Sequence, residues 1–319
     1  MSSSNPSTKK TRTWRSKVLE PAGFVKLGLL SSQFADLVAL RDFLQTKVSI
    51  SNEQRDCFLP DIDVLSDIIA ERSCIGEDIA ETILLASKRL ARQANSEGAS
   101  TWNEANWQRL CHTPSLESII GLFSNEFIMS VEEKWNWLNM VEEGISLPSH
   151  KPDYTFTLQV KVDEPSVLSR DFLDSQLRRL DPYVNELSAI GAYPFATVES
   201  KSFQGAVLEA ENQCGESVVK MLFKLRQLGG EALKLPVLTI ALVGSLCIMY
   251  LGTSKVVSNG KIRYYMKDVW SGMLSNLNSS IEFHIMFYRY LEWVRDTYQP
   301  TIMTALERVA SEAMEENMA

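Results

Sequence analysis

The chain has little of what marks specialised folds: 15 Gly, 11 Pro and 5 Cys among 319 residues. So little glycine and proline excludes collagen-like and low-complexity proteins. The cysteines, at positions 57, 74, 111, 214 and 247, are odd in number and far apart. We therefore expect free thiols in a reducing compartment, nucleus or cytoplasm, and not a disulfide scaffold. With 45% hydrophobic and 23% charged residues, the composition is that of a folded protein of about two domains.

Several catalytic motifs are also missing. His112, His150 and His284 are isolated, and no Cys-x-x-Cys or His-x-x-x-His spacing accompanies them, which argues against a zinc site. We interpret His112 as a hydrogen-bonded helix residue. The chain has no Gly-x-Ser-x-Gly elbow of a serine hydrolase and no Gly-x-x-x-x-Gly-Lys phosphate loop. We expect no small-molecule cofactor.

Positive charge is scarce overall but concentrated at the start. The chain holds 32 basic and 40 acidic residues, a net charge of −8, so no global positive field attracts nucleic acid. Residues 1–19 are basic and lack the apolar core of a secretory signal, so we expect a disordered basic tail. It could serve nuclear import, tether a phosphate-bearing partner, or be a plain solvated tail. Residues 311–319 are predicted to form an acidic tail.

One uncharged run could be mistaken for a membrane span. No charge occurs from Leu235 to Ser254, a length that would allow a transmembrane helix. Gly244-Ser245 divides the run into halves of strand length, and glycine supplies the positive φ of a tight hairpin turn. The pattern favours two buried strands, 237–243 and 246–251, over a membrane helix. Asn259-Gly260 then predicts a turn into a third strand, 261–266.

The remaining pattern predicts an α/β fold, with a mixed sheet flanked by helices and an all-helical N-terminal region. Helical periodicity covers about 20–145, and strands are expected at 154–160 and 193–198 with an insertion at about 165–190 between them. A helix with an apolar stripe from Phe203 to Leu228 should end at Gly229-Gly230. Ser279-Ser-Ile-Glu282 resembles a capping box opening a last helix that Pro300 interrupts. We expect a basic tail (1–19), a helical region (20–100), an α/β domain (101–310) and an acidic tail (311–319).

Three residues could carry chemistry together. Asp153 precedes the first predicted strand, and Glu199 and Lys201 end the second. Because residues two apart on a strand point to one face, Glu199 and Lys201 would share a site. Two carboxylates from neighbouring strands can chelate Mg²⁺, and the lysine could orient or deprotonate a water. An exposed ion pair at the strand ends is the simpler alternative.

The motifs around these residues resemble those of the PD-(D/E)XK nuclease superfamily, and more closely those of fungal PD-(D/E)XK nuclease-like domain proteins. The resemblance covers roughly residues 100–300. It is carried by Asn103-Glu-Ala-Asn-Trp107, Cys111-His112, Pro152-Asp153-Tyr154, Thr197-Val-Glu-Ser-Lys201, Gln213-Cys-Gly215, the hairpin at 236–251, Leu291-Glu-Trp-Val294 and Tyr298-Gln-Pro300.

The resemblance implies a restriction-endonuclease-like core and a metal-dependent nuclease, with DNA as the favoured substrate. It implies that Asp153 and Glu199 bind Mg²⁺ or Mn²⁺, that the Ser200 carbonyl adds a ligand, and that Lys201 assists catalysis. Glu104 would be an extra acid on the leading helix, and Gln213 would border the site. Phosphate could meet a basic surface if the following residues converge: Arg109, Arg178-Arg179, Lys220, Lys224, Arg226 and Lys234.

Two alternatives to the enzyme stay open on sequence grounds. The first keeps the nuclease fold without catalysis, as an interaction module that binds protein or nucleic acid through its helical half. The second is a single-pass membrane protein spanning 235–254.

Overall fold

A computed structural model describes residues 14–28, 32–45, 77–131, 151–158, 193–205, 207–230 and 233–318. In these residues the chain forms an α/β fold around one mixed sheet of seven strands, in the order β1-β7-β6-β5-β4-β3-β2. The strands are β1 (Phe24–Lys26), β2 (Phe127–Val131), β3 (Tyr154–Leu158), β4 (Ala196–Lys201), β5 (Val237–Val243), β6 (Leu246–Val256) and β7 (Ile262–Met273). The predicted mixed sheet flanked by helices is confirmed.

Strand pairing changes direction at the centre of the sheet. β2, β3 and β4 form an antiparallel meander. After β4 the chain passes through helix α8 (Val207–Gly229) and returns as β5, which is parallel to β4. β5, β6 and β7 are antiparallel, and the short β1 pairs parallel with β7 at the edge. A parallel pair needs a crossover connection, and α8 supplies it between β4 and β5.

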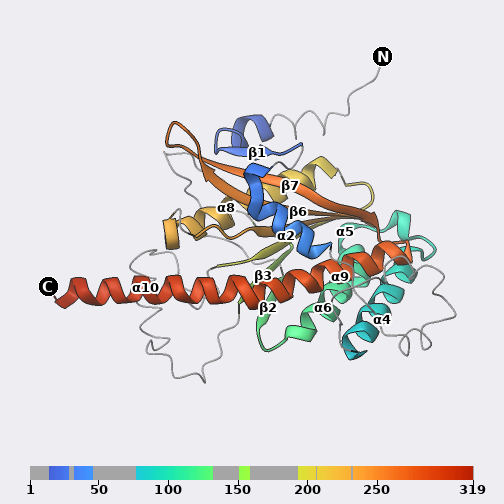
Figure 1. Ribbon diagram of the computed structural model, residues 1–319. Helices are drawn as coiled ribbons and strands as arrows, with labels where there is room; N and C mark the ends of the chain where they lie inside the picture. Colours follow the sequence, from blue (N-terminus) through green and yellow to red (C-terminus); the bar gives the residue numbers. More distant parts are fainter. Residues whose placement is uncertain are drawn as a thin grey trace, which may run out of the picture.

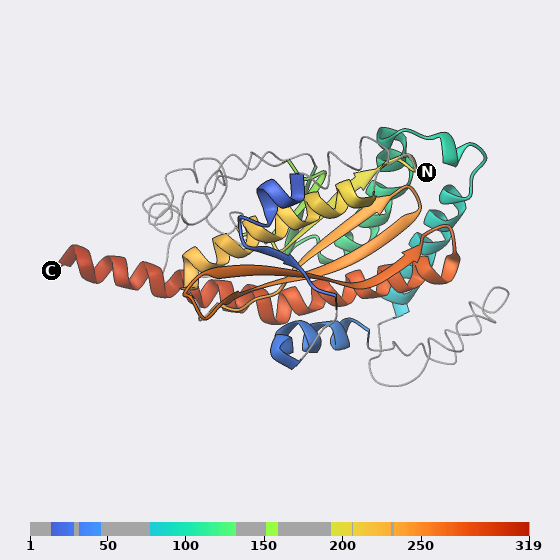
Figure 2. The same ribbon diagram turned by 90° about the horizontal axis from the view of Figure 1, so that it is seen from above.

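Helices cover both faces of the sheet (Figures 1 and 2). On one face α8 packs along β4 and β5, with Cys214 against Thr239. On the other face Phe287 of α9 (Leu277–Trp293) meets Phe156 of β3, with ring centroids 5.3 Å apart. Further helical segments are α2 (Ala35–Leu44), α4 (Glu77–Ala94), α5 (Glu104–Trp107), η6 (Gln108–His112), α6 (Thr113–Ile120), η10 (Val294–Tyr298) and α10 (Gln299–Met318). The remaining short turns are η1 (Arg15–Leu19), η2 (Ser32–Phe34), η5 (Ala99–Thr101) and η7 (Gly121–Phe123).

The uncharged run forms the predicted hairpin. Gly244 has φ +58° between β5 and β6, and every residue of β5 is buried. Since β5 lies between strands and under α8, no position along it faces water, which explains the unbroken apolar sequence. No helix in the described part of the chain is long and apolar enough to cross a membrane.

The N-terminal half differs from the all-helical prediction at two places. β1 and β2 are strands within the range expected to be helical, and both form edges of the sheet. α4 does match the expected helix, whereas the pattern at Val64 to Ile69 lies outside the described residues. Buried residues from Leu19 to Leu306 form one hydrophobic cluster, so the described N-terminal elements pack on the same core as the sheet.

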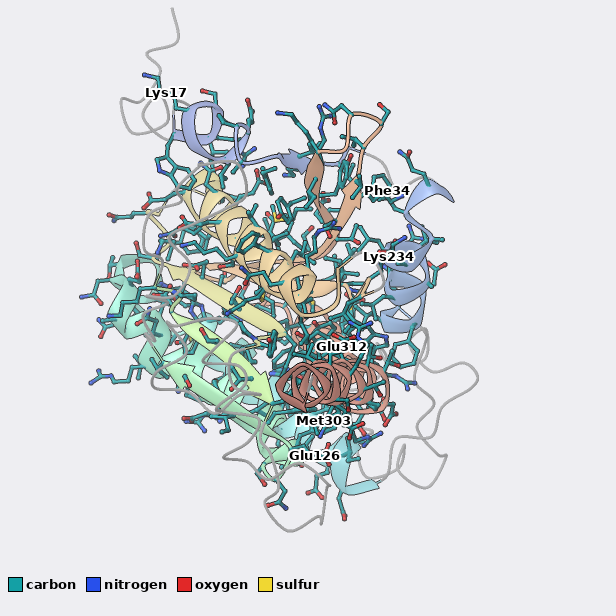
Figure 3. The ribbon with its side chains drawn as sticks, turned by 90° about the vertical axis from the view of Figure 1, so that its left-hand side faces the viewer. Lys17, Phe34, Glu126, Lys234, Met303 and Glu312 are labelled. Carbon is teal, nitrogen blue, oxygen red and sulfur yellow. The ribbon has the colours of Figure 1, made fainter. Side chains whose placement is uncertain are left out.

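The C-terminal helices also begin and end elsewhere than expected. Asn276 caps α9, because its side chain accepts from the N–H groups of Asn278 and Ser279, so the capping box at 279–282 is wrong. α9, η10 and α10 follow one another without a gap from Leu277 to Met318, so Pro300 does not interrupt the last helix as predicted; the π-helical segment η10 directly precedes it. The helix continues to Met318 through the predicted acidic tail. Figure 3 looks nearly along this helix, which carries the labelled Met303 and Glu312.

Candidate active site

The site lies where β3 and β4 part. The paired register of the two strands ends at Tyr154 and Val198, after which β4 continues beside β5 alone. The N–H of Ser200 donates to Asp153 Oδ2 over 2.6 Å. The Ser200 N–H has no partner on β3, so the Asp153 carboxylate accepts its hydrogen bond instead. This bond holds Asp153 beside the end of β4.

Lys201 links the strand end to the leading helix. Its Nζ lies 3.8 Å from Asp153 Oδ2 and 3.7 Å from Glu104 Oε2. Glu104 is the first residue of α5, and Asn103 caps that helix by accepting from the Asn106 N–H over 2.9 Å. The helix start therefore brings a second carboxylate to the ammonium group.

Glu199 is the buried acid of the group. It is 1% exposed and shares the α8 face of β4 with Lys201, because side chains alternate along a strand. Burial raises its pKa well above 4.5, the negative charge of Asp153 raises it further, and Lys201 acts in the opposite direction. Burial also raises the pKa of Glu104, while Lys201 lowers it. These couplings bring Asp153, Glu199, Lys201 and Glu104 into one electrostatic group.

This group suits a divalent cation in its donor chemistry. Asp153 and Glu199 offer hard carboxylate oxygens, and each disfavours the charge of the other, a cost that a bound cation would offset. No set of three or more His, Cys, Asp or Glu side chains within the described ranges is grouped to hold a metal. A site here would use two side chains together with main-chain or water oxygens, and the Ser200 carbonyl lies between Glu199 and Lys201 in sequence.

Gln213 lies on α8, directly before the Cys214 that packs on Thr239. Its side-chain oxygen is buried and accepts no hydrogen bond from the described residues. A polar atom in that state lacks the partner that burial normally demands. That Gln213 borders the site stays a prediction.

The predicted basic surface does not form on α8. Lys220 is fully buried and its Nζ lies 2.8 Å from Glu216 Oε1, and Lys224 is only 2% exposed. Burial lowers the pKa of Lys220. Arg226 in the last turn of α8 is half-buried, Arg109 and Lys234 are exposed, and Arg178-Arg179 lies outside the described residues. The two buried lysines are therefore unable to present charge to a phosphate backbone, which corrects the expectation for this helix.

His112 is a neighbour of the site that the sequence pattern did not point to. Its Nε2 lies 3.0 Å from the Gly244 carbonyl, which only accepts, so Nε2 carries the proton and Nδ1 accepts from Ser200 Oγ over 2.8 Å. Burial lowers the pKa of His112 to about 4, consistent with this neutral form. The imidazole thus ties the leading helix to the strand residue between Glu199 and Lys201. Its hydrogen bonding confirms the interpretation of His112 as a satisfied residue.

No protein-family model matches the chain, and no curated protein matches it.

Proposed function

We propose that the protein is a divalent-metal-dependent nuclease that hydrolyses phosphodiester bonds, with DNA as the favoured substrate. The observation that supports this most is the meeting of Asp153 and Lys201 at the end of β4, with the buried Glu199 on the same strand. Two carboxylates and an ammonium group supply a cation site and a group that can act on water.

The strand order supports a restriction-endonuclease-like core of the PD-(D/E)XK kind. The continuous helical segment α5–η6–α6 comes first, followed by the antiparallel meander β2–β3–β4. α8 follows, and then β5, parallel to β4. Because β3 and β4 are antiparallel, the start of β3 lies beside the end of β4. Asp153 before β3 therefore meets Glu199 and Lys201 of β4, although about 45 residues separate them in the chain.

In the proposed reaction Asp153, Glu199 and the Ser200 carbonyl would hold Mg²⁺ or Mn²⁺. When bound, the cation polarises the phosphate and stabilises its developing negative charge. Lys201 Nζ would orient the attacking water as an ammonium group, or accept its proton as a neutral amine. The water oxygen bonds to phosphorus as the bond to the ester oxygen breaks, and the leaving ester oxygen takes a proton from the lysine or from solvent. Glu104 holds the ammonium group from the other side at 3.7 Å, and His112 fixes Ser200 between the two strand residues.

A cleavage assay tests the proposal. The purified chain is incubated with plasmid or single-stranded DNA and Mg²⁺ or Mn²⁺, beside Asp153→Ala and Lys201→Ala. The matched controls are Asp268→Ala and Lys267→Ala, an ion pair of the same types on β7 at 2.9 Å. We expect cleavage by wild type and both controls, and loss of it in both site variants.

Two results would overturn the enzyme. Equal cleavage by wild type and site variants would point to a contaminant, and no cleavage by any protein would remove the activity. DNA binding without cleavage in that second case would support the non-catalytic interaction module instead.

A further inference from the structure

An aromatic group borders the candidate site on the side of the leading helix. Trp107 stacks on His112 with ring centroids 5.6 Å apart and an interplanar angle of 24°. Trp102 meets Trp107 edge-on at 5.4 Å, and Phe203 lies 6.4 Å from Trp107. Trp107 is buried at the base of this group, whereas the Phe203 side chain is 49% exposed. The group therefore presents the Phe203 ring to the surface over a buried tryptophan.

Phe203 is held by the same turn that holds Lys201. The Gly244 N–H donates to the Lys201 carbonyl over 2.8 Å, and the Phe203 ring covers Gly244. A Cβ at Gly244 would come within 2.5 Å of that ring, so only glycine allows this approach. The sequence pattern placed Phe203 in the apolar stripe of α8, but the residue lies in the turn before that helix and outside its buried face.

Glu104 of the site and Trp107 of the aromatic group share the leading helix. Glu104, which lies 3.7 Å from Lys201, precedes Trp107 by three residues on α5, so both side chains share one side of that helix. An exposed ring thus packs on the helix that carries Glu104 and follows Lys201 by two residues. Single-strand binders likewise combine an aromatic ring for the base with charged groups for the backbone.

We propose that Phe203 stacks on an unpaired base of the nucleic acid, so that the substrate is single-stranded or carries a single-stranded end. This inference rests on the proposed function and names its substrate class. Bases inside a duplex already stack on one another, so a flat ring at the surface gains a partner only where a base is unpaired. Stacking on aromatic residues tolerates every base, so no sequence preference is expected from Phe203.

Binding is measured apart from cleavage, with Ca²⁺ and the Lys201→Met variant as background. The probes are a labelled single-stranded oligonucleotide and its duplex, and a second oligonucleotide carries 2-aminopurine, whose fluorescence falls when it stacks. Phe203→Leu keeps an apolar side chain without a ring, and Phe203→Tyr keeps the ring. Phe43→Leu is the matched control, an exposed phenylalanine of α2 that lies against Arg289.

We expect Phe203→Leu to weaken single-strand binding about 5- to 150-fold and to abolish the 2-aminopurine quenching. Phe203→Tyr should retain both, and duplex binding should be weaker and insensitive to Phe203. Unchanged quenching in Phe203→Leu, or equal binding of strand and duplex, would overturn the inference while leaving the nuclease standing. Absence of all nucleic-acid binding and cleavage would remove both.

Discussion

The buried carboxyl of Glu199 should make the protein less stable as the pH rises, and Glu199→Gln should remove that effect. Burial and Asp153 raise the Glu199 pKa well above 4.5, so the folded state keeps this proton to a higher pH than the unfolded chain does. The stability that Glu199 contributes is then fully present below pH 4.5 and is lost as the pH rises through the folded-state pKa.

The size of the effect follows from proton linkage. One proton held by the folded state alone changes the free energy of unfolding by about 1.4 kcal/mol per pH unit. Glutamine has the same shape and does not titrate. As the pH rises, the free energy of unfolding of the variant should therefore increase relative to wild type at about that rate, until the folded-state pKa of Glu199 is passed. Ionisable groups remote from the site titrate alike in both proteins and cancel in the difference.

The measurement is urea denaturation of both proteins at pH 5, 6, 7 and 8 with EDTA present. Adding Mn²⁺ at pH 8 should then stabilise wild type, by about 2.7 kcal/mol at a hundred times its Kd, and should not stabilise the variant. A difference in the free energy of unfolding between the two proteins that stays constant from pH 5 to 8 would refute the electrostatic reasoning. So would a wild type that becomes more stable relative to the variant at high pH.

Three further outcomes are expected. Lys201→Met should slow single-turnover cleavage about 10²- to 10⁴-fold with oligonucleotide Kd preserved, and a lost Kd would contradict a role in proton transfer. His284 is buried among Ser87, Ser115 and the Ser280 carbonyl, and burial lowers its pKa from 6.5 to about 4. The neutral His284 should contribute about 3 kcal/mol to the free energy of unfolding, present above pH 6.5 and lost as the pH falls through 4. Urea titrations that show no such fall in stability in acid would contradict this. In Gly244→Ala the added Cβ would sit at φ +58° and would clash with the Phe203 ring, so the free energy of unfolding should fall by about 1–3 kcal/mol. An unchanged melting temperature would count against the tight turn.

Local patterns in the sequence determine much of the central sheet. The hairpin at Gly244 and the turn at Gly260, with φ +78°, are readable because positive φ selects glycine. β3, β4 and β5 carry enough β-branched and apolar residues in a short span to be recognised, and α8 has a strong helical period. The candidate residues Asp153, Glu199 and Lys201 stand out because they border these strands.

Tertiary pairing decided what short segments and buried charges do. β1 has three residues, too few for any periodicity, and becomes a strand only by pairing with Tyr264 to Met266, about 240 residues later. The charges of Lys220 and Lys224 suggested a solvated helix face, but burial depends on what packs over the helix, which sequence spacing does not encode. The reach of Glu104 to Lys201, the hydrogen bonds of His112 and the exposure of Phe203 likewise depend on how the leading helix meets the ends of β4 and β5. Local preference acts within a few residues, whereas these contacts join segments far apart in the chain, so only the packed fold could set them.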